Sequence, residues 1–301
     1  MSVAQFWHPF ALEPFLNALF IGLSIGSVWL LAALGLAVIY GTMGVINMAH
    51  GEFIMLGAYS TYVLTTFLGV PVLLCLPAAF VIVGAIGLVM ERTLIRFLYH
   101  RPLDTLLATS GVSLVLIQGV RLIFGGSPQN IPLPAWVSPV MDIGFFHLAW
   151  LRLYIMIVTF GLIGLTWIIM YRTKWGVQVR AVAQNKEVAS ACGVNADVVY
   201  GLTFAYGAGL AGVAGVLFSA FKDVFPDMGA DYIVEAFLVV VVGGVGTLLG
   251  SAASAGLLGE LSSIFSYFTN DTFAKFVLFT LVVVFLRFRP QGLFAESAAR
   301  R

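Results

Sequence analysis

Long apolar segments, separated by short polar stretches, recur along the whole of this chain. A helix needs about 20 mainly apolar residues to cross the hydrocarbon core of a bilayer, and most of these segments reach that length. Only 10% of the residues are charged, whereas a typical water-soluble domain has about 25%. The chain is therefore expected to fold as an all-α, polytopic membrane protein whose outer surface mostly contacts lipid.

About nine transmembrane helices are expected from segment length. They cover Phe15–Tyr40, Val45–Leu68, Val72–Met90, Leu103–Phe124, Leu153–Tyr171, Tyr200–Ala220, Val234–Gly250, Ser251–Phe268 and Phe273–Leu286. The seventh and eighth segments adjoin without a polar loop, and the sequence GGVGTLLG between Gly243 and Gly250 is equally typical of a broken or re-entrant helix. A helical bundle in lipid needs no further division, so residues 1–301 are expected to form a single domain.

The distribution of basic residues predicts the orientation. Eleven of the fifteen lysines and arginines lie in the loops after the third and fifth segments and in the C-terminal tail, which share one side if nine segments cross. Short cytoplasmic loops are enriched in these residues, so the N-terminus is expected outside and the C-terminus in the cytoplasm. The first ten residues, MSVAQFWHPF, contain no lysine or arginine, so no cleaved signal peptide is expected.

Several classes of function are disfavoured. The net charge of +1 gives no indication of a nucleic-acid partner. Cys75 lies in an apolar segment and Cys192 in a polar loop expected on the opposite side, so no disulfide is expected. No G-x-x-x-x-G-K-[ST] motif occurs, so the chain is not expected to bind ATP by a P-loop or to act as an enzyme. Any active transport would draw its energy from another subunit or from an ion gradient.

Polar residues are concentrated in the segment Gly44–Tyr59, GVINMAHGEFIMLGAY. Asn47, His50 and Glu52 would be costly facing lipid, so they are expected to face protein or a water-filled path. On a helix with about 100° per residue, His50 and Glu52 would lie about 160° apart. Either Gly51 breaks the helix, or His50 and Glu52 contact different neighbours. A packing role and a role in lining a substrate path both remain open; a metal site is disfavoured because no second His or Cys lies at ligand spacing.

The polar stretch Arg172–Val199 contains RAVAQNKEVASACGVN, which predicts a short amphipathic helix on the cytoplasmic face. Val182, Val188, Ala189 and Cys192 can share its apolar face, and Gly193 is a suitable residue to end it. The helix could dock another protein or could simply connect two transmembrane helices along the membrane surface.

Gly207, Gly209 and Gly212 in the sixth segment form a G-x-G-x-x-G pattern, which continues to Gly215. No strand is expected before it and no acidic residue follows at the required distance, so dinucleotide binding is disfavoured. Small residues at this spacing allow helices to approach closely, which is the role expected for Gly207, Gly209, Gly212 and Gly215, and also for Gly22 and Gly26.

Acidic residues fall into two groups. Asp223, Asp227 and Asp231 lie in an expected outer loop and are predicted to be solvated, with docking of a soluble partner as the alternative. Glu235 and Glu260 lie near or within the seventh and eighth segments, where a carboxylate needs a buried partner.

Specific blocks of the sequence resemble a known family. GLAVIYGTMGVINMAHGEFIMLGAY, RAVAQNKEVASACGV, AYGAGLAGVAGVL, FLVVVVGGVGTLLGS and the terminal RPQGLF resemble the permease subunits of branched-chain amino-acid ABC importers, over nearly the whole chain. Within that group, RPLDTLLATSGVSLVL and VINMAHGE are most similar to the first permease subunit of urea importers.

The resemblance implies a permease of the bacterial inner membrane that works with a second, homologous permease. Two ATP-binding subunits would dock on the cytoplasmic face, and a solute-binding protein would deliver substrate outside. The matching docking loop contains Arg180, Ala183, Gln184, Asn185, Glu187, Ala189 and Gly193. Asn47, His50 and Glu52 would lie near the substrate path, and no cofactor or metal is implied.

Urea is the first expectation for the substrate, because it is neutral and the expected helices contain little charge. Branched-chain amino acids are the second; as zwitterions they would favour a charge or a helix terminus at the site. A gradient-driven carrier or channel for a small polar solute remains a third possibility.

Overall fold

In a computed structural model of the chain, the structure describes residues 12–99, 101–131, 140–142 and 147–294. Its helices are α1 Leu12–Met43, α2 His50–Leu68, α3 Val72–Thr93, the 3-10 helix η3 Ile95–Phe97, α4 Pro102–Phe124, α5 Trp150–Arg172, α6 Lys174–Gln184, α7 Lys186–Ala191, α8 Ala196–Phe218, α9 Met228–Gly243, α10 Leu248–Phe268 and α11 Asp271–Phe288. The described residues also include one short antiparallel pair, β1 Val140–Asp142 and β2 His147–Ala149, and an isolated bridge between Gln129 and Val224.

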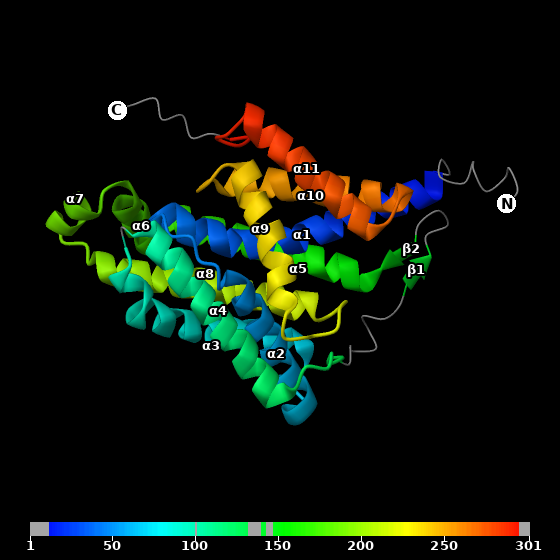
Figure 1. Cartoon of the computed structure of the whole chain (residues 1–301), viewed down its shortest axis with the longest axis horizontal. Coiled ribbons are helices and arrows are strands. Elements are labelled where there is room, and N and C mark those ends of the chain that lie inside the picture. Colours follow the sequence, from blue (N-terminus) through cyan, green and yellow to red (C-terminus); the bar gives the residue numbers. More distant parts are fainter. Residues whose placement is uncertain (1–11, 100, 132–139, 143–146, 295–301) are drawn as a thin grey trace, which may run out of the picture.

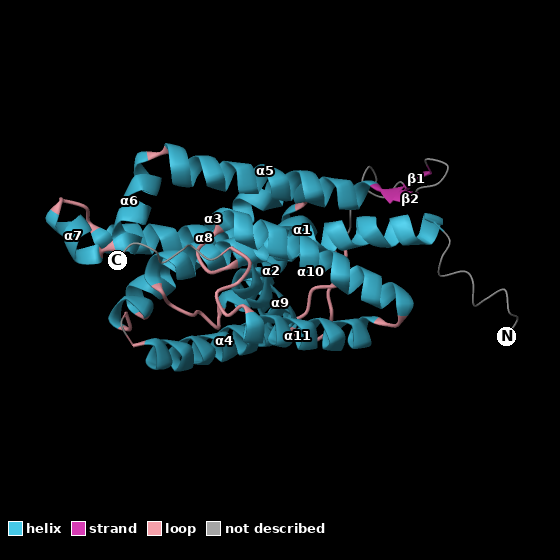
Figure 2. Cartoon of the chain, turned by 90° about the horizontal axis from the view of Figure 1, so that it is seen from above, coloured by secondary structure: helices cyan, strands magenta, loops and turns pink. Residues whose placement is uncertain are grey.

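Most of the long helices run roughly along the longest axis of the molecule (Figure 1). The first turns of α1 lie at the same end as β1 and β2, whereas α6 and α7 project from the opposite end, shown on the left of Figure 1. The last turns of α11 lie toward the end that carries α6 and α7. Figure 2, seen from above, shows α5 along one edge of the bundle and α4 and α11 along the other.

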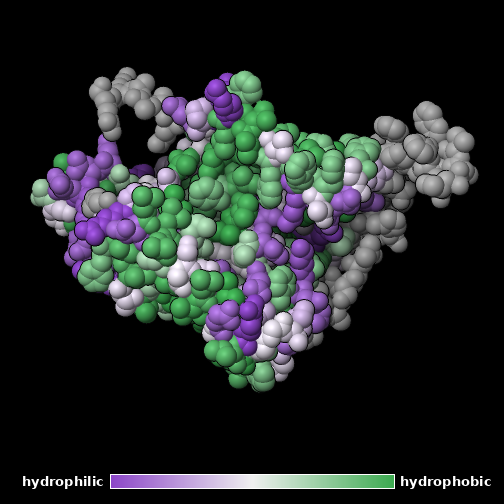
Figure 3. Space-filling model, in the orientation of Figure 1, coloured by the Kyte–Doolittle hydropathy of each residue, from purple (hydrophilic) through white to green (hydrophobic). Residues whose placement is uncertain are grey.

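Helix α8 forms the centre of the bundle, where it packs against α1, α2 and α3. Of its most apolar 18-residue stretch, 83% is buried inside the molecule, against 17% for α4 and 22% for α5. The outer helices are as apolar as the central one, because their side chains must face hydrocarbon instead of protein. Apolar residues accordingly cover much of the face in Figure 3, and hydrophilic residues gather at the end with α6 and α7.

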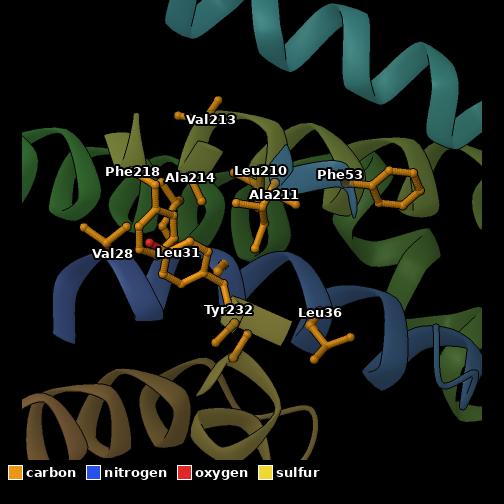
Figure 4. Packing of buried hydrophobic residues seen from close by; sticks show 14 of the residues in the cluster. Val28, Leu31, Leu36, Phe53, Leu210, Ala211, Val213, Ala214, Phe218 and Tyr232 are labelled. Atoms are coloured by element: carbon orange, nitrogen blue, oxygen red, sulfur yellow. The ribbon is translucent and has the colours of Figure 1, made fainter. Parts of the chain in front are cut away.

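The core between α1, α8 and α9 is filled by aliphatic and aromatic side chains (Figure 4). Leu31 and Leu210 are almost completely buried there. The rings of Phe218 and Tyr232 stack with 3.7 Å between their centroids, which joins the end of α8 to the start of α9. Stacked rings of this kind add to the stabilisation from apolar burial.

Within the part of the chain that the structure describes, six helices are long and apolar enough to cross a membrane, by length and composition only. They span Phe15–Met43, Val72–Phe97, Pro102–Phe124, Trp150–Arg172, Ala196–Phe218 and Leu248–Phe268. The segments α2, α9 and α11 are outside this set: α9 has only 16 residues, and α11 contains three charged residues. The expected total of about nine crossings therefore stays a prediction.

The predicted boundary between the seventh and eighth segments, at Gly250 and Ser251, is wrong. Helix α9 already ends at Gly243, and α10 begins at Leu248. The turn between them uses Gly244 and Gly246, which have φ of 98° and 81°, a conformation that favours glycine. Gly250 instead lies inside α10, where a Cβ would stand 2.1 Å from the carbonyl oxygen of Gly243.

The second predicted helix also begins later than expected. Residues 44–49 are not helical and α2 starts at His50 rather than Val45. Helix α9 likewise follows a non-helical return after α8, and the first turns of α2 and α9 meet. A Cβ on Gly51 would lie 2.3 Å from the carbonyl oxygen of Gly229, so the two backbones are in direct contact.

Candidate functional site

The expected path residues Asn47, His50 and Glu52 lie at the junction between the non-helical segment and α2. All three are buried, with at most 2% of each residue exposed. Asn47 Oδ1 accepts a hydrogen bond from the backbone N–H of Ala49 at 3.0 Å, which stabilises the turn that leads into α2. These side chains are thus held inside the protein, as a polar group within a membrane requires.

His50 contacts α1. Its Nε2–H donates to the carbonyl oxygen of Ala32 at 3.0 Å, and its ring meets Phe53 edge-on at 6.2 Å. Gly35 lies alongside, because a Cβ there would stand 3.2 Å from the imidazole and 2.4 Å from the carbonyl oxygen of Gly207. His50 therefore fills the place where α1 crosses α8.

Glu52 points to the other side of α2 and contacts α4 and α9. The hydroxyl of Ser113 donates to Glu52 Oε1 at 2.6 Å. Glu52 Oε2 lies against Gly229, where a Cβ would be 2.1 Å away, and has no hydrogen-bond partner among the described residues. Of the two alternatives, the second is the one observed: Gly51 does not break α2, and His50 and Glu52 contact different neighbours.

These contacts have the geometry of helix packing. Asn47, His50 and Glu52 face separate partners and do not converge on one point, so they do not form a common ligand-binding cluster in this conformation. Their role in lining a substrate path stays a prediction.

The expected cytoplasmic helix is two helices, α6 and α7, separated at Asn185. Asn185 Oδ1 accepts from the N–H of Val188 at 3.0 Å and so caps α7. Gly193 follows α7 with φ of 87°. Of the predicted docking residues, Ala189 is buried, whereas the others are exposed: Arg180, Ala183, Gln184, Asn185, Glu187 and Gly193.

The predicted apolar face of this helix is partly wrong. Val182 and Ala189 are buried as expected, but Val188 is 59% exposed and Cys192 is exposed too. Val182 of α6 and Ala189 of α7 pack in one buried cluster, so of the four predicted residues only these two face the protein.

Lys186 connects α7 to the helical bundle. Its ammonium lies 5.4 Å from the ring of Tyr99 and 5.2 Å from that of Tyr200. The hydroxyl of Tyr99 in turn donates to the buried carboxylate of Glu91 in α3. Burial raises the pKa of Tyr99 above its usual range, so its hydroxyl remains protonated and is the donor.

The four glycines of α8 face three different helices. A Cβ on Gly207 would meet α1 at Gly35, one on Gly209 or Gly212 would meet α3, and one on Gly215 would lie 2.0 Å from the carbonyl oxygen of Ile54 in α2. Similarly, Gly22 and Gly26 of α1 lie against α10. Each of these positions brings a backbone close to a neighbouring helix.

The acidic residues between α8 and α9 and those within α9 and α10 have more varied partners than expected. Asp227 forms an ion pair with Arg121 at 2.6 Å, and Asp223 accepts a hydrogen bond from Asn130. Glu235 is buried and pairs with Lys275 at 2.7 Å. Glu260 Oε2 has no hydrogen-bond partner among the described residues.

Sequence reasoning missed a cavity of about 780 Å³ that is lined by residues of α1, α5, α8, α9, α10 and α11, including the pair of Glu235 and Lys275. The only indication of this cavity in the sequence was a set of charged residues at the ends of apolar segments. Each of them, taken alone, indicated only that a buried charge would need an oppositely charged or hydrogen-bonding partner.

Comparisons with known proteins place the chain in a family. The model of the permease component of the branched-chain amino acid transport system matches residues 18–286. The chain is 32% identical to the high-affinity branched-chain amino acid transport system permease protein LivH of Salmonella typhimurium, over 95% of this chain and 97% of that protein. It is 31% identical to BraD of Pseudomonas aeruginosa, over 95% and 98%.

A more distant relative is LivM of Escherichia coli, another branched-chain amino acid permease protein, which is 23% identical over 88% of this chain and 67% of that protein. No solved structure matches the chain. The chain belongs to the family of permease components of branched-chain amino acid transport systems. It is a multi-pass protein of the inner membrane, and its relatives are transport components and not enzymes.

Proposed function

We propose that this chain is a permease subunit of an ABC importer that moves branched-chain amino acids across the bacterial inner membrane. The observation that carries the proposal is its similarity to LivH and BraD, which extends over 95% of the chain and so includes both the bundle and the α6–α7 connection. The family description supports branched-chain amino acids, which were the second expectation, over urea, which was the first.

The proposal includes the partners of such an importer. LivM is similar to this chain and shares its system name with LivH, which supports a second, homologous permease beside this one. Two ATP-binding subunits would supply the energy and a solute-binding protein would deliver the substrate. Residues 1–301 would act as a single permease domain, with the N-terminus outside, the C-terminus in the cytoplasm and α6–α7 as the coupling element.

The position of α6 and α7 supports this orientation, because they project from one end of the bundle with mostly hydrophilic residues around them (Figures 1 and 3). Lys186 and the ring of Tyr99 link α7 to Glu91 of α3. A displacement of α7 by an ATPase would therefore be transmitted to the bundle at this contact.

Uptake of labelled L-leucine and urea in a strain that lacks this gene tests the substrate. Leucine uptake should fall on deletion and recover when the gene is restored, while urea uptake should be unchanged. The opposite pattern would return the substrate to urea. Leucine uptake that persists after deletion of the ATPase genes, but depends on this chain, would instead favour a gradient-driven carrier.

The substitution Glu187→Arg tests docking, because Glu187 is exposed on α7. We expect ATP hydrolysis by the assembled importer to lose its dependence on the loaded binding protein. Lys174→Glu, an exposed position at the start of α6 outside the predicted docking set, is the matched control. Equal coupling in both variants would argue against docking through α7.

A further inference from the structure

The cavity lies between the N-terminal part of α1, as far as Trp29, the first turns of α5, α9 and α11 and the last turns of α8 and α10. Every one of these ends except the start of α9 lies toward the end of the bundle that is remote from α6 and α7 (Figure 1). Its volume of about 780 Å³ is within the range of small-molecule binding pockets. In the proposed orientation it is reached from the outer side of the membrane.

The carboxylate of Glu235 lines the cavity, and one of its two oxygens accepts no hydrogen bond from the described residues. The Glu235 side chain is only 3% exposed, and its Oε1 accepts from Lys275 Nζ at 2.7 Å. Its Oε2 is buried and has no hydrogen-bond partner among the described residues. A buried carboxylate oxygen without a donor is costly, so this atom offers a position for the ammonium group of a ligand.

The same cavity contains cationic groups that the Glu235 pair does not neutralise. Arg152, at the start of α5, and Lys222, after the end of α8, both line it. No ion pair joins Arg152 to another residue in the part of the chain that the structure describes, and the Lys222 ammonium lies 5.7 Å from the ring of Tyr232. A guanidinium is well suited to bind a carboxylate by two parallel hydrogen bonds.

Apolar side chains line the same cavity. Trp29 of α1 and Ile155 of α5 both line the cavity and are otherwise buried. An aliphatic side chain could be buried against them while the charged ends of the same molecule contact Glu235 and Arg152. Binding sites commonly combine a mainly apolar wall with a few polar groups that set the orientation of the ligand.

We propose that this cavity is a binding chamber for an aliphatic L-α-amino acid, with the ammonium group at Glu235 and the carboxylate at Arg152 and Lys222. The inference rests on the proposed function and adds a place for the substrate within this chain. Asp271, the second carboxylate of the lining, already accepts a hydrogen bond from the Ser266 hydroxyl. Urea, which has no charge, would leave Glu235, Arg152 and Lys222 without matching groups.

Two other readings of the chamber must be distinguished. The pair of Glu235 and Lys275 could serve packing alone, and the headgroup of phosphatidylethanolamine also combines an ammonium with an anion. The test therefore uses the complete importer in nanodiscs of phosphatidylcholine and phosphatidylglycerol, which contain no such headgroup. The background is C75A/C192A, so that no native thiol of this chain reacts, and modification is read on this chain alone.

In this background, S262C introduces a thiol into the chamber wall. A polar methanethiosulfonate reagent should modify it, and L-leucine should slow the modification in a saturable way, without any phosphatidylethanolamine. Absence of modification in the ligand-free importer, or no slowing by L-leucine, would overturn the proposal. Slowing that appears only when phosphatidylethanolamine is added would assign the chamber to lipid and would also overturn it.

Substitutions of the charged groups identify the contacts. E235Q and R152Q should each raise the leucine concentration for half-protection by about tenfold or more, because a charge-assisted hydrogen bond contributes about 1.5–3 kcal/mol. E260Q is the matched control, since Glu260 is another carboxylate with an unpartnered oxygen but does not line the chamber. Equal shifts in E260Q and E235Q, or no shift in either, would overturn the assignment.

The exchanged pair E235K/K275E separates binding from packing. It preserves an ion pair between α9 and α11 but moves the carboxylate from α9 to α11. Protection by leucine should therefore stay weak. Full recovery of protection would show that the pair acts structurally, against the proposal. Leucine uptake by the unmodified importer is measured separately. Uptake without protection would reject the binding chamber but leave the proposed function standing. Protection without uptake would reject leucine import but leave the cavity as an amino-acid binding site.

Discussion

Individual glycines determine how closely the central helices pack. At Gly215, Gly57 and Gly35 a Cβ would lie within 2.4 Å of a backbone carbonyl oxygen on a neighbouring helix. Backbone atoms cannot rotate away as the end of a side chain can, so each of these positions excludes any larger residue. Glycines on the outer helices, such as Gly161, have no such neighbour within 4 Å.

Gly215→Ala should therefore destabilise the protein, while Gly161→Ala should not. Overpacking in a core costs about 1–3 kcal/mol, and more where the backbone must move. The midpoint of thermal unfolding of the purified permease complex measures the difference. A similar midpoint for both variants would show that α2 and α8 can separate without loss of stability.

Buried polar residues in α2 depend on single partners in other helices. Ser113→Ala would leave both carboxylate oxygens of Glu52 without a donor among the described residues, at a cost of about 1–3 kcal/mol. We expect a lower unfolding midpoint and a rescue by Ser113→Thr, which keeps the hydroxyl.

Ser110→Ala is the control for this prediction, because the Ser110 hydroxyl donates only to Leu106 in its own helix. The prediction is contradicted if Ser113→Ala and Ser110→Ala lower the midpoint equally.

Among whole elements, α7 is short and has little buried surface. It has six residues, of which only Ala189 is buried, so it lacks the apolar burial that stabilises most helices in proteins. Its N-cap and the contact of Lys186 with two tyrosine rings hold it in place. A short element of this kind can move without unfolding the bundle, which a coupling helix requires.

Asn185→Ala should weaken the coupling between ATP hydrolysis and import. Loss of an N-cap side chain costs about 1 kcal/mol, which is a large share of the stability of so short a helix. The measurement is the number of ATP molecules hydrolysed per leucine imported in proteoliposomes, and we expect this ratio to rise.

Asn195→Ala provides the comparison. Asn195 caps α8 in the same way, with Val198 N–H at 3.2 Å, but α8 has 23 residues and is held by packing along its length. A ratio that rises equally in both variants would mean that capping in general, and not α7, controls coupling.

The whole molecule has two chemically different ends. The end with α6 and α7 contains the exposed Cys192, whereas Cys75 is buried. If that end is cytoplasmic, a membrane-impermeant maleimide should label Cys192 in inside-out vesicles but not in intact spheroplasts. Labelling should disappear in Cys192→Ser, and strong labelling of spheroplasts would reverse the proposed orientation.

Much of the fold could be predicted from the sequence, because the physical constraint in a bilayer is local. A segment that crosses lipid must satisfy its own backbone hydrogen bonds and expose apolar side chains, so the approximate positions of α1, α3, α4, α5, α8 and α10 could be read from hydropathy. The turn at Gly244 and Gly246 was harder to predict, because a run of glycines and valines does not show which residue has positive φ.

The candidate sites depended more on tertiary contacts. The spacing of His50 and Glu52 showed that they cannot share one helix face, but only the packing of α1, α4 and α9 around α2 decided that their partners are Ala32 and Ser113. Tertiary contacts likewise decided that Ala189 of α7 is buried while its neighbour Val188 is exposed.

The apolar segments and scarce charges by themselves determined that this is a helical membrane protein, and its sequence blocks determined its family. Tertiary structure alone decided that Arg152, Lys222, Glu235 and Lys275, from four separate parts of the chain, line one cavity. The physical reason is that hydropathy is a property of each segment, whereas a cavity is formed by the ends of several helices whose relative positions depend on side-chain packing.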